Sequence, residues 1–481
     1  MSDRKLALAI YLFCTAVYAA TAGQRLLRPS SDTHFVYQAQ SWLAHRLDLG
    51  GPPPHQNDWA DVEYLKLRDG TEVAGQFLRS TPGSFRTLKG QVRVIADADI
   101  SARSHKYYVS FPPFPAVLML PIVALCGPRT NDVVFTVALA GMVPALLFLL
   151  LRRLPRLLAA PEAAAEGGSA ELSVGSCLWL VALFAFGSVY YFSSVLGQVW
   201  FTAHIVSLVL CGLYLLCALP ARRPLLAGLC VGAMYLTRPQ MAALGLLFVL
   251  ELLAVHAPDK DKNEGRYPLA LRRLRTLPWR RIAPQLVLFL APCALFFAVG
   301  ALHNLARFAR PMEFGHSYLT TIQADNIQRF GLMNYQYLPR NLAAALCLLP
   351  KLLATAPYLQ ISYHGLALWF TTPALFYLLW PEREALTGER RALALLLGIC
   401  VIPTALASLL YQNTGYIQFG YRFSLDYMLP LILMLALVRP RGITTDAFRI
   451  LVIWGIVVNL FGAITFGRLW QFYFNGFFPV S

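Results

Sequence analysis

An aspartate, Asp32, follows the first apolar segment and opens a stretch in which apolar residues recur at three- and four-residue spacing. These residues are Phe35, Val36, Ala39, Trp42 and Leu43. The spacing predicts a short amphipathic helix along a membrane surface, with the carboxylate at the boundary between water and lipid. A carboxylate placed beside a reacting hydroxyl can take up its proton. A structural role is the alternative, because Ser31 and Asp32 are both residue types that cap helix N-termini.

Three arginines lie where predicted membrane helices break or end. They are Arg238 in Thr237-Arg238-Pro239, Arg307 near the end of the segment 303–308, and Arg422 in the aromatic segment 418–423. A guanidinium stays charged beside a membrane, binds phosphate oxygens through two parallel N–H groups and stabilises a developing negative charge. Interfacial arginines also simply extend toward lipid headgroups. The tight turn at Pro239 favours a binding role for Arg238, and both interpretations stay open for Arg307 and Arg422.

Further polar residues carry no specific motif. The candidates for substrate binding are His34, Tyr37, His204, His303, Asn304 and Glu313. A lone histidine near an apolar face is most often structural. All nine cysteines lie in apolar stretches, without a CxxC pair or a Cys/His cluster, so neither a disulfide framework nor a zinc site is indicated.

The composition identifies the class of protein that must position these residues. Of the 481 residues, 57% are hydrophobic and only 14% are charged, against about 25% charged in soluble domains. The formal net charge of +16 comes from basic clusters between apolar runs. Positive residues on the inner side of a membrane explain these clusters better than a nucleic-acid partner does.

Eleven apolar segments are long enough, or nearly so, to be predicted as membrane helices. They cover about 5–22, 132–151, 175–196, 199–219, 224–237, 239–256, 284–303, 364–380, 391–411, 426–438 and 448–466. With a cytoplasmic N-terminus, the basic clusters after the second, fourth, sixth, eighth and tenth helices all face the cytoplasm, including the strongly basic loop 257–283. This topology places Asp32 and the three arginines on the external side.

The segment 23–131 is predicted to be the first external loop. Within it, residues of about 50–106 form a small β insertion, because Val62–Phe77 reads as a hairpin around an Asp69-Gly70 turn and residues 92–95 add a strand. The apolar run 111–126 starts with prolines and is predicted to lie in the interface, since a full span there would move every later basic cluster outside.

This layout resembles the GT-C superfamily of membrane glycosyltransferases, which includes protein O-mannosyltransferases and aminoarabinose transferases. The resemblance rests on the acidic residue Asp32 after the first helix, on Pro112-Pro113 at the second juxtamembrane segment, and on Thr237-Arg238 at a helix break. It implies a single all-α polytopic domain over residues 1–481, a GT-C-like bundle of about eleven helices with juxtamembrane helices. The chain departs from the family near the start of the fourth helix, where Gln198 and His204 stand in place of a second acid.

The resemblance also implies a function. A sugar would pass from a polyprenyl-phosphate donor to a hydroxyl of a glycan, lipid or protein acceptor, outside a bacterial inner membrane. Asp32 would be the base or acceptor anchor, and Arg238, Arg422 and Arg307 would bind the donor phosphate; a divalent metal stays open as a cofactor. The rival hypothesis is a non-enzymatic lipid or solute transporter, which predicts charges at mid-membrane and repeat symmetry. A third is a GT-C-shaped protein that has lost catalysis.

Overall fold

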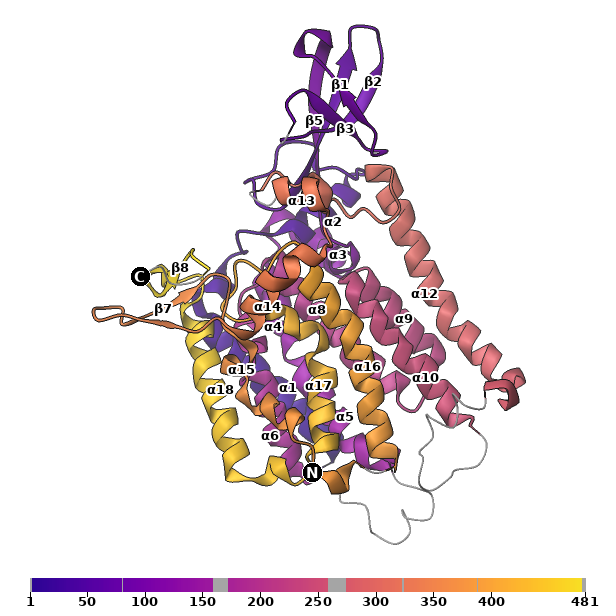
Figure 1. Ribbon diagram of the computed structural model, residues 1–481, viewed down its shortest axis with the longest axis vertical. Helices are drawn as coiled ribbons and strands as arrows, with labels where there is room; N and C mark the ends of the chain where they lie inside the picture. Colours follow the sequence, from indigo (N-terminus) through magenta and orange to yellow (C-terminus); the bar gives the residue numbers. More distant parts are fainter. Residues whose placement is uncertain are drawn as a thin grey trace.

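The computed structural model describes residues 2–79, 81–158, 172–257, 274–321, 324–386 and 388–477. Most of these residues are helical, and Figure 1 shows the helices side by side in one bundle with a small sheet projecting from one end. The N-terminus lies at the opposite end of the bundle (Figure 1). The predicted first external loop is therefore a cap on one end of a helical body.

Six helices in the described part of the chain are long and apolar enough to cross a membrane. They span Asp3–Leu27, Asp132–Pro155, Gln198–Ala218, Trp279–Phe308, Gly388–Leu410 and Asp446–Thr465. Shorter apolar helices span Phe114–Arg129, Val174–Ala185, Pro224–Tyr235 and Pro239–Val255. The chain is thus an apolar helical protein of the integral-membrane type. Six helices of full length in its described part do not confirm the prediction of about eleven spans.

The third predicted span, 175–196, is two helices. Helix α6 (Val174–Ala185) ends before Gly187, and a short helix α7 (Tyr190–Ser194) follows. A side chain at Gly455 would come within 2.6 Å of the Gly187 carbonyl oxygen, so α18 (Asp446–Thr465) approaches the backbone closely at this break. The close helix contact accounts for the interruption, which an apolar run alone does not reveal.

The predicted span 364–380 is wrong as a continuous helix. Only a four-residue helix, α15 (Leu368–Thr371), and a 3-10 turn, η8 (Pro373–Leu379), form there. Pro373 disfavours the helical conformation of Thr372 and therefore ends α15. Proline also starts the 3-10 segment η4 (Pro239–Gly245) ahead of α10 (Leu246–Val255), within the predicted span 239–256.

The β insertion is confirmed and is larger than predicted. The sheet has five strands in the order β4-β3-β2-β1-β5. The strands are β1 (Trp59–Leu67), β2 (Glu72–Phe77), β3 (Ser84–Thr87), β4 (Val92–Val94) and β5 (Ile100–Val109). The predicted hairpin is present, with Lys66 opposite Glu72 across the turn at Asp69-Gly70. Strand β5 ends at Val109, three residues beyond the predicted end of the insertion near residue 106.

Two short helices connect this sheet to the bundle. Helix α2 (His34–Leu43) follows Asp32, and α3 (Phe114–Cys126) follows Pro112-Pro113. The 13 residues of α3 cover about 20 Å at 1.5 Å per residue, less than the roughly 30 Å of a bilayer core. Their apolar faces pack together through Phe35, Val36 and Met119. The juxtamembrane pair thus forms a platform beneath the sheet.

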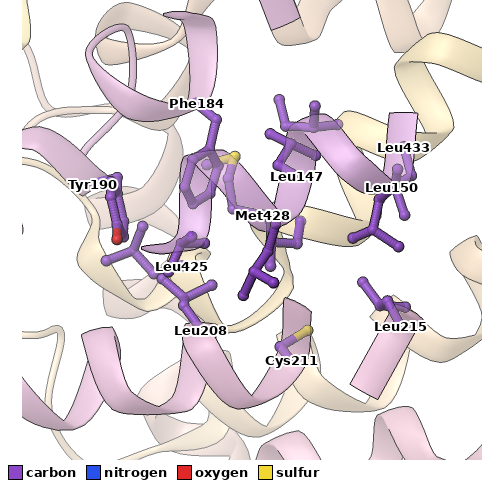
Figure 2. Close-up of a cluster of buried hydrophobic side chains, with 14 of the residues drawn as sticks. Leu147, Leu150, Phe184, Tyr190, Leu208, Cys211, Leu215, Leu425, Met428 and Leu433 are labelled. Atoms are coloured by element: carbon purple, nitrogen blue, oxygen red, sulfur yellow. The ribbon is translucent and has the colours of Figure 1, made fainter. Parts of the chain in front are cut away.

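The core of the bundle lies between α5 (Met142–Leu158), α6, α8 (Gln198–Ala218) and α17 (Leu425–Val438). Figure 2 shows Leu147, Phe184, Leu208 and Met428 from these four helices facing one another. The central position of α8 buries most of its surface. This packing fixes the N-terminal ends of α8 and α17, which carry the polar residues Gln198, His204 and Asp426.

A second, small sheet was not predicted. Strands β6 (Lys351–Leu352), β7 (Leu359–Ser362) and β8 (Tyr473–Phe474) pair in that order. Figure 1 shows the hairpin that contains β7 projecting sideways from the bundle near one end of α18. Short helices α13 (Ala324–Phe330) and α14 (Leu338–Leu346) lie between the sheet-bearing end and this hairpin.

Candidate functional site

A cavity of about 360 Å³ opens where the cap meets the bundle. Its walls are largely apolar and include Phe111, Trp200, Phe314, Tyr411 and Phe423. An aspartate, a histidine and two arginines line it as well, namely Asp58, His316, Arg238 and Arg422. An apolar cavity with a few convergent charged groups is the usual form of a ligand site. This cavity is therefore the candidate functional site.

Arg422 is the cation with free hydrogen-bonding capacity in this cavity. It sits in the turn η10 (Arg422–Ser424) before α17, with only 4% of its surface exposed. Its Nε and Nη1 atoms have no hydrogen-bond partner within the described chain. Its guanidinium lies 5.2 Å from the ring centre of Phe201 and 5.9 Å from that of Trp200. Burial, together with neighbouring Arg238, lowers the pKa of Arg422 to about 9, so it stays a cation at neutral pH.

Arg238, by contrast, is already paired. Its Nε and Nη2 atoms donate to the two carboxylate oxygens of Asp426 at 2.5 and 2.6 Å. Gln240 donates to the same carboxylate at 2.8 Å, and the Nδ1 atom of His204 lies 3.3 Å from it. The predicted break at Thr237–Pro239 is confirmed, since α9 (Pro224–Tyr235) ends just before it. The break turns Arg238 toward the cavity while Asp426 offsets its charge.

Asp58 supplies the carboxylate that faces the cavity. It immediately precedes β1, and one carboxylate oxygen accepts a 2.8 Å hydrogen bond from Trp200 Nε1. Its backbone has a φ of 56°, in the left-handed region, which aspartate and asparagine tolerate better than most residues. Burial raises the pKa of Asp58, and the indole hydrogen bond partly opposes this shift. Asp58 is thus a carboxylate poised to accept a proton.

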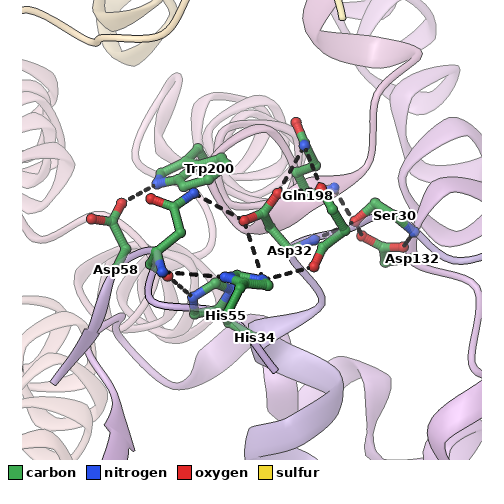
Figure 3. A network of polar contacts seen from close by, with 10 residues as sticks. Ser30, Asp32, His34, His55, Asp58, Asp132, Gln198 and Trp200 are labelled. Atoms are coloured by element: carbon green, nitrogen blue, oxygen red, sulfur yellow. Dashed lines mark hydrogen bonds and ion pairs between the residues drawn. The ribbon is translucent and has the colours of Figure 1, made fainter. Parts of the chain in front are cut away.

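Asp32 lies outside this cavity, in the network shown in Figure 3. Its carboxylate accepts hydrogen bonds from Asn57 at 3.1 Å, Gln198 at 2.9 Å and Ser31 at 2.5 Å, and His55 lies 3.6 Å away. The capping interpretation is wrong, because Thr33 is the N-cap of α2 and no side chain caps it. Asp32 instead ties the start of α8 to the segment that leads to Asp58.

Asp132, which the sequence analysis did not single out, completes this network. Its carboxylate accepts from the backbone N–H of Ser30 and of Gln198, both at 2.8 Å (Figure 3). The turn before α8 passes so close that a side chain at Gly197 would lie 2.8 Å from Val133. The positive φ of 66° there also favours glycine. This turn holds Gln198 between the two aspartates.

His34 and Tyr37 support the same segment. The His34 ring stacks on Trp59 with ring centres 3.8 Å apart, and its Nε2 atom lies 3.0 Å from the Asn57 carbonyl oxygen. Tyr37 contacts Trp59 edge-on at 5.6 Å. Burial lowers the pKa of His34 to about 4, so the ring is neutral at pH 7. Both residues thus hold the backbone next to Asp58.

Arg307, Asn304 and His303 lie on α12 (Trp279–Phe308) and do not line the cavity. Arg307 donates to the carbonyl oxygens of Val109 and His303 and to the Asn304 side chain. These bonds fasten the end of β5 to α12. Glu313 is also used internally, since it accepts from the backbone N–H of Gly315 at 2.7 Å. The predicted role of Arg307 in binding the donor phosphate stays a prediction, as do the predicted roles of His303, Asn304 and Glu313 in substrate binding.

Two further ionisable residues of the cavity, like Asp58, were not predicted from the sequence. His316 follows the turn at Gly315 and lies edge-on to Phe111 at 5.4 Å. Tyr411 comes directly after α16 (Gly388–Leu410), and burial raises its pKa to about 12. Tyr411 lines the same cavity as Asp58, Arg238 and Arg422. Neither residue has a sequence motif, because tertiary packing alone brings them here.

Comparison with known proteins finds no matching family model, no matching curated protein and no matching solved structure. Among the described residues, no group of three or more His, Cys, Asp or Glu side chains is arranged to hold a metal ion.

The predicted basic loop 257–283 lies mostly outside the described residues, which include only 257 and 274–283 of it.

Proposed function

We propose that the protein is a membrane glycosyltransferase that moves a sugar from a polyprenyl-phosphate donor to an acceptor hydroxyl at the capped, external face. The observation that carries the proposal is the buried Arg422 in the cavity, with two N–H-bearing nitrogens free of partners in the described structure. Asp58 shares the cavity and offsets part of this charge, but the buried Nε and Nη1 atoms of Arg422 still lack an acceptor, and an unmade hydrogen bond on a buried charged group is costly. A phosphate in the cavity would accept both N–H groups.

The rest of the cavity fits such a donor. Its aromatic and aliphatic walls suit a sugar ring and the first part of a polyprenyl chain. Arg238 would add positive charge as the phosphate leaves, although Asp426 offsets part of it. Asp58, a carboxylate of the cavity lining, would take the acceptor proton, and Asp32 would position the Asn57–Asp58 segment. These roles shift the predicted base from Asp32 to Asp58.

The Arg422 assignment predicts a loss of donor affinity. Arg422→Gln removes the charge, so the affinity for undecaprenyl monophosphate should fall by about 10- to 100-fold, which corresponds to roughly 1.5–3 kcal/mol for a charged hydrogen bond. Arg422→Lys removes only the planar fork, so its loss should be smaller. A titration of the purified protein with undecaprenyl monophosphate measures both affinities. Arg129→Gln, an exposed charge change at the same end, is the matched control. Wild-type affinity in Arg422→Gln would exclude Arg422 from the site.

Sugar transfer itself needs a separate measurement. Membranes that contain the protein should release polyprenyl phosphate and transfer label when supplied with polyprenyl-phosphate-linked labelled sugars, and Arg422→Gln membranes should do neither. Binding without turnover for any sugar tested would support a protein of this shape that lacks catalysis. Movement of the intact labelled lipid across the bilayer would support the transporter.

The external orientation of the cap can be tested by thiol labelling. Lys89→Cys places a thiol in the turn between β3 and β4, and Ala447→Cys places one at the start of α18. Both positions are exposed, and these elements lie at opposite ends of the molecule (Figure 1). In a background with exposed Cys126 and Cys347 replaced by serine, an impermeant reagent on intact cells should modify Lys89→Cys and spare Ala447→Cys. The reverse pattern would place the cavity on the cytoplasmic side.

A further inference from the structure

Two arginines meet where the C-terminal segment crosses the end of the first helix. Arg25 lies in the 3-10 turn η1 (Gly23–Leu27) after α1 (Asp3–Ala22), and Arg468 follows α18. Arg468 Nη2 donates to the Thr21 carbonyl oxygen at 2.8 Å and also to that of Ala22. Arg25 Nη2 donates to the Phe466 carbonyl oxygen. Each arginine thus binds the C-terminal end of the helix to which the other belongs.

These hydrogen bonds offset only part of the positive charge of the two arginines. A helix C-terminus carries about half a negative charge, so two helix ends offset roughly one of the two guanidinium charges. The two guanidinium groups lie at one place, since a side chain at Gly467 would come within 3.4 Å of Arg25 Nη2 and one at Gly23 within 4.0 Å of Arg468 Nη2. Within the described residues neither arginine pairs with a carboxylate, and the buried Arg25 Nη1 atom has no hydrogen-bond partner. About one positive charge and one buried N–H-bearing nitrogen remain for an anion.

The surface around the pair is suited to a membrane interface. We define the ledge as η1, the hairpin of β6 and β7, and the segment 466–474. It exposes large apolar side chains, with Leu27 84%, Leu352 82%, Trp470 78% and Tyr358 66% exposed. Soluble surfaces seldom leave so many large side chains open to water together, whereas tryptophan and tyrosine are enriched at headgroup level.

The position of the ledge agrees with this environment. It lies at one end of α1 and α18, whose exposed faces carry Leu12, Phe13, Ile453 and Val457. Both helices are long and apolar enough to cross a membrane. The hairpin projects sideways from the bundle at this level (Figure 1), over the area that lipid headgroups around α18 would occupy. The cavity around Arg422 is built from other residues, so this is a separate surface.

We propose that Arg25 and Arg468 bind the phosphate of an anionic phospholipid while the exposed apolar residues of the ledge insert among its acyl chains. The lipid would supply the counter-charge that the chain itself does not provide at this place. Binding would also hold the C-terminal segment against α1 and thereby fix the edge of the bundle.

The test uses the full-length protein purified in detergent and titrated with dioleoylphosphatidylglycerol, with bound lipid counted by native mass spectrometry. Arg25→Gln and the double variant Arg25→Gln/Arg468→Gln should bind the lipid about tenfold more weakly than wild type, and Arg129→Gln should match wild type. Undecaprenyl monophosphate binding should be unchanged in Arg25→Gln, because Arg25 does not line the cavity. If the double variant does not fold, Arg25→Gln alone still decides the test. This single variant should fold, because it removes one hydrogen bond, to the Phe466 carbonyl oxygen.

Four outcomes would overturn the proposal. Equal phosphatidylglycerol binding by wild type and Arg25→Gln would remove the arginines from any lipid site. Equal binding of dioleoylphosphatidylcholine would remove the requirement for an anionic lipid, and full competition by inorganic phosphate would indicate a free-anion site. Insertion of the ledge is measured separately, by the quenching of tryptophan fluorescence by lipids brominated near the glycerol backbone. Trp470→Phe should show less quenching than wild type, because Trp470 would no longer contribute. Unchanged quenching would place the ledge in water.

Discussion

Asp58→Asn should lower the rate of sugar transfer by about 10²–10⁴-fold, the usual contribution of a positioned general base. Asparagine is the appropriate replacement because it tolerates the positive φ of this residue and its carbonyl oxygen can still accept the Trp200 hydrogen bond. The protein should therefore fold and bind donor normally. Initial rates of label transfer at saturating donor measure the loss.

The pH dependence of the same reaction gives an independent check. Burial raises the pKa of Asp58, and a base acts only when deprotonated, so the rate should fall as the pH drops through this raised pKa. The acidic limb of the profile should therefore lie above the range of an exposed aspartate, near 3.9. In Asp58→Asn that limb should disappear from the residual activity.

Asp32→Asn is the matched comparison. It removes one charge from the segment that leads to Asp58, yet the new amide keeps one oxygen that can accept from Asn57 or Gln198. A positioning role predicts a loss of tenfold or less with normal donor binding. Should Asp32→Asn lose as much activity as expected for Asp58→Asn, while Asp58→Asn stays active, the sequence-based assignment of Asp32 as the base would be restored.

Local signals predicted the parts of this site that depend on neighbouring residues. The turn at Asp69-Gly70 identified the hairpin, and the proline of Thr237-Arg238-Pro239 identified the break that turns Arg238 toward the cavity. Both rest on backbone preferences that act within four residues. The amphipathic spacing after Asp32 likewise predicted α2.

The remaining features depend on contacts between distant segments. Asp426 neutralises Arg238 across 188 positions of the sequence, which explains why Arg238 looked like the free cation and Arg422 looked ambiguous. Asp58 has no motif of its own, and only the packing of β1 against Trp200 brings it to the cavity. The length of an apolar run also does not reveal where a helix ends because another helix packs closely against it. The contact between Gly187 and Gly455 is such a place.

The pairing of Arg238 with Asp426 predicts the largest loss of stability. Asp426→Asn keeps the size of the side chain but leaves a largely buried guanidinium, 13% exposed, without its counter-charge. Removing one partner of a buried ion pair costs about 3–5 kcal/mol. Asp446→Asn is the matched control, because Asp446 pairs with Arg449 at the surface, where ion pairs contribute at most about 1 kcal/mol. Thermal unfolding in detergent should separate the two variants clearly, and equal midpoints would contradict the structural role of the pair.

The double variant Arg238→Gln/Asp426→Asn distinguishes stability from function. It removes both charges, so much of the stability lost in Asp426→Asn should return, since a buried ion pair can often be replaced by neutral groups at little cost. Donor binding should not return to the wild-type level, because the second cation facing the phosphate is gone. Recovery of stability without recovery of donor affinity would assign Arg238 to the phosphate and Asp426 to holding it. Recovery of both would leave Arg422 as the sole phosphate-binding residue of the proposed site.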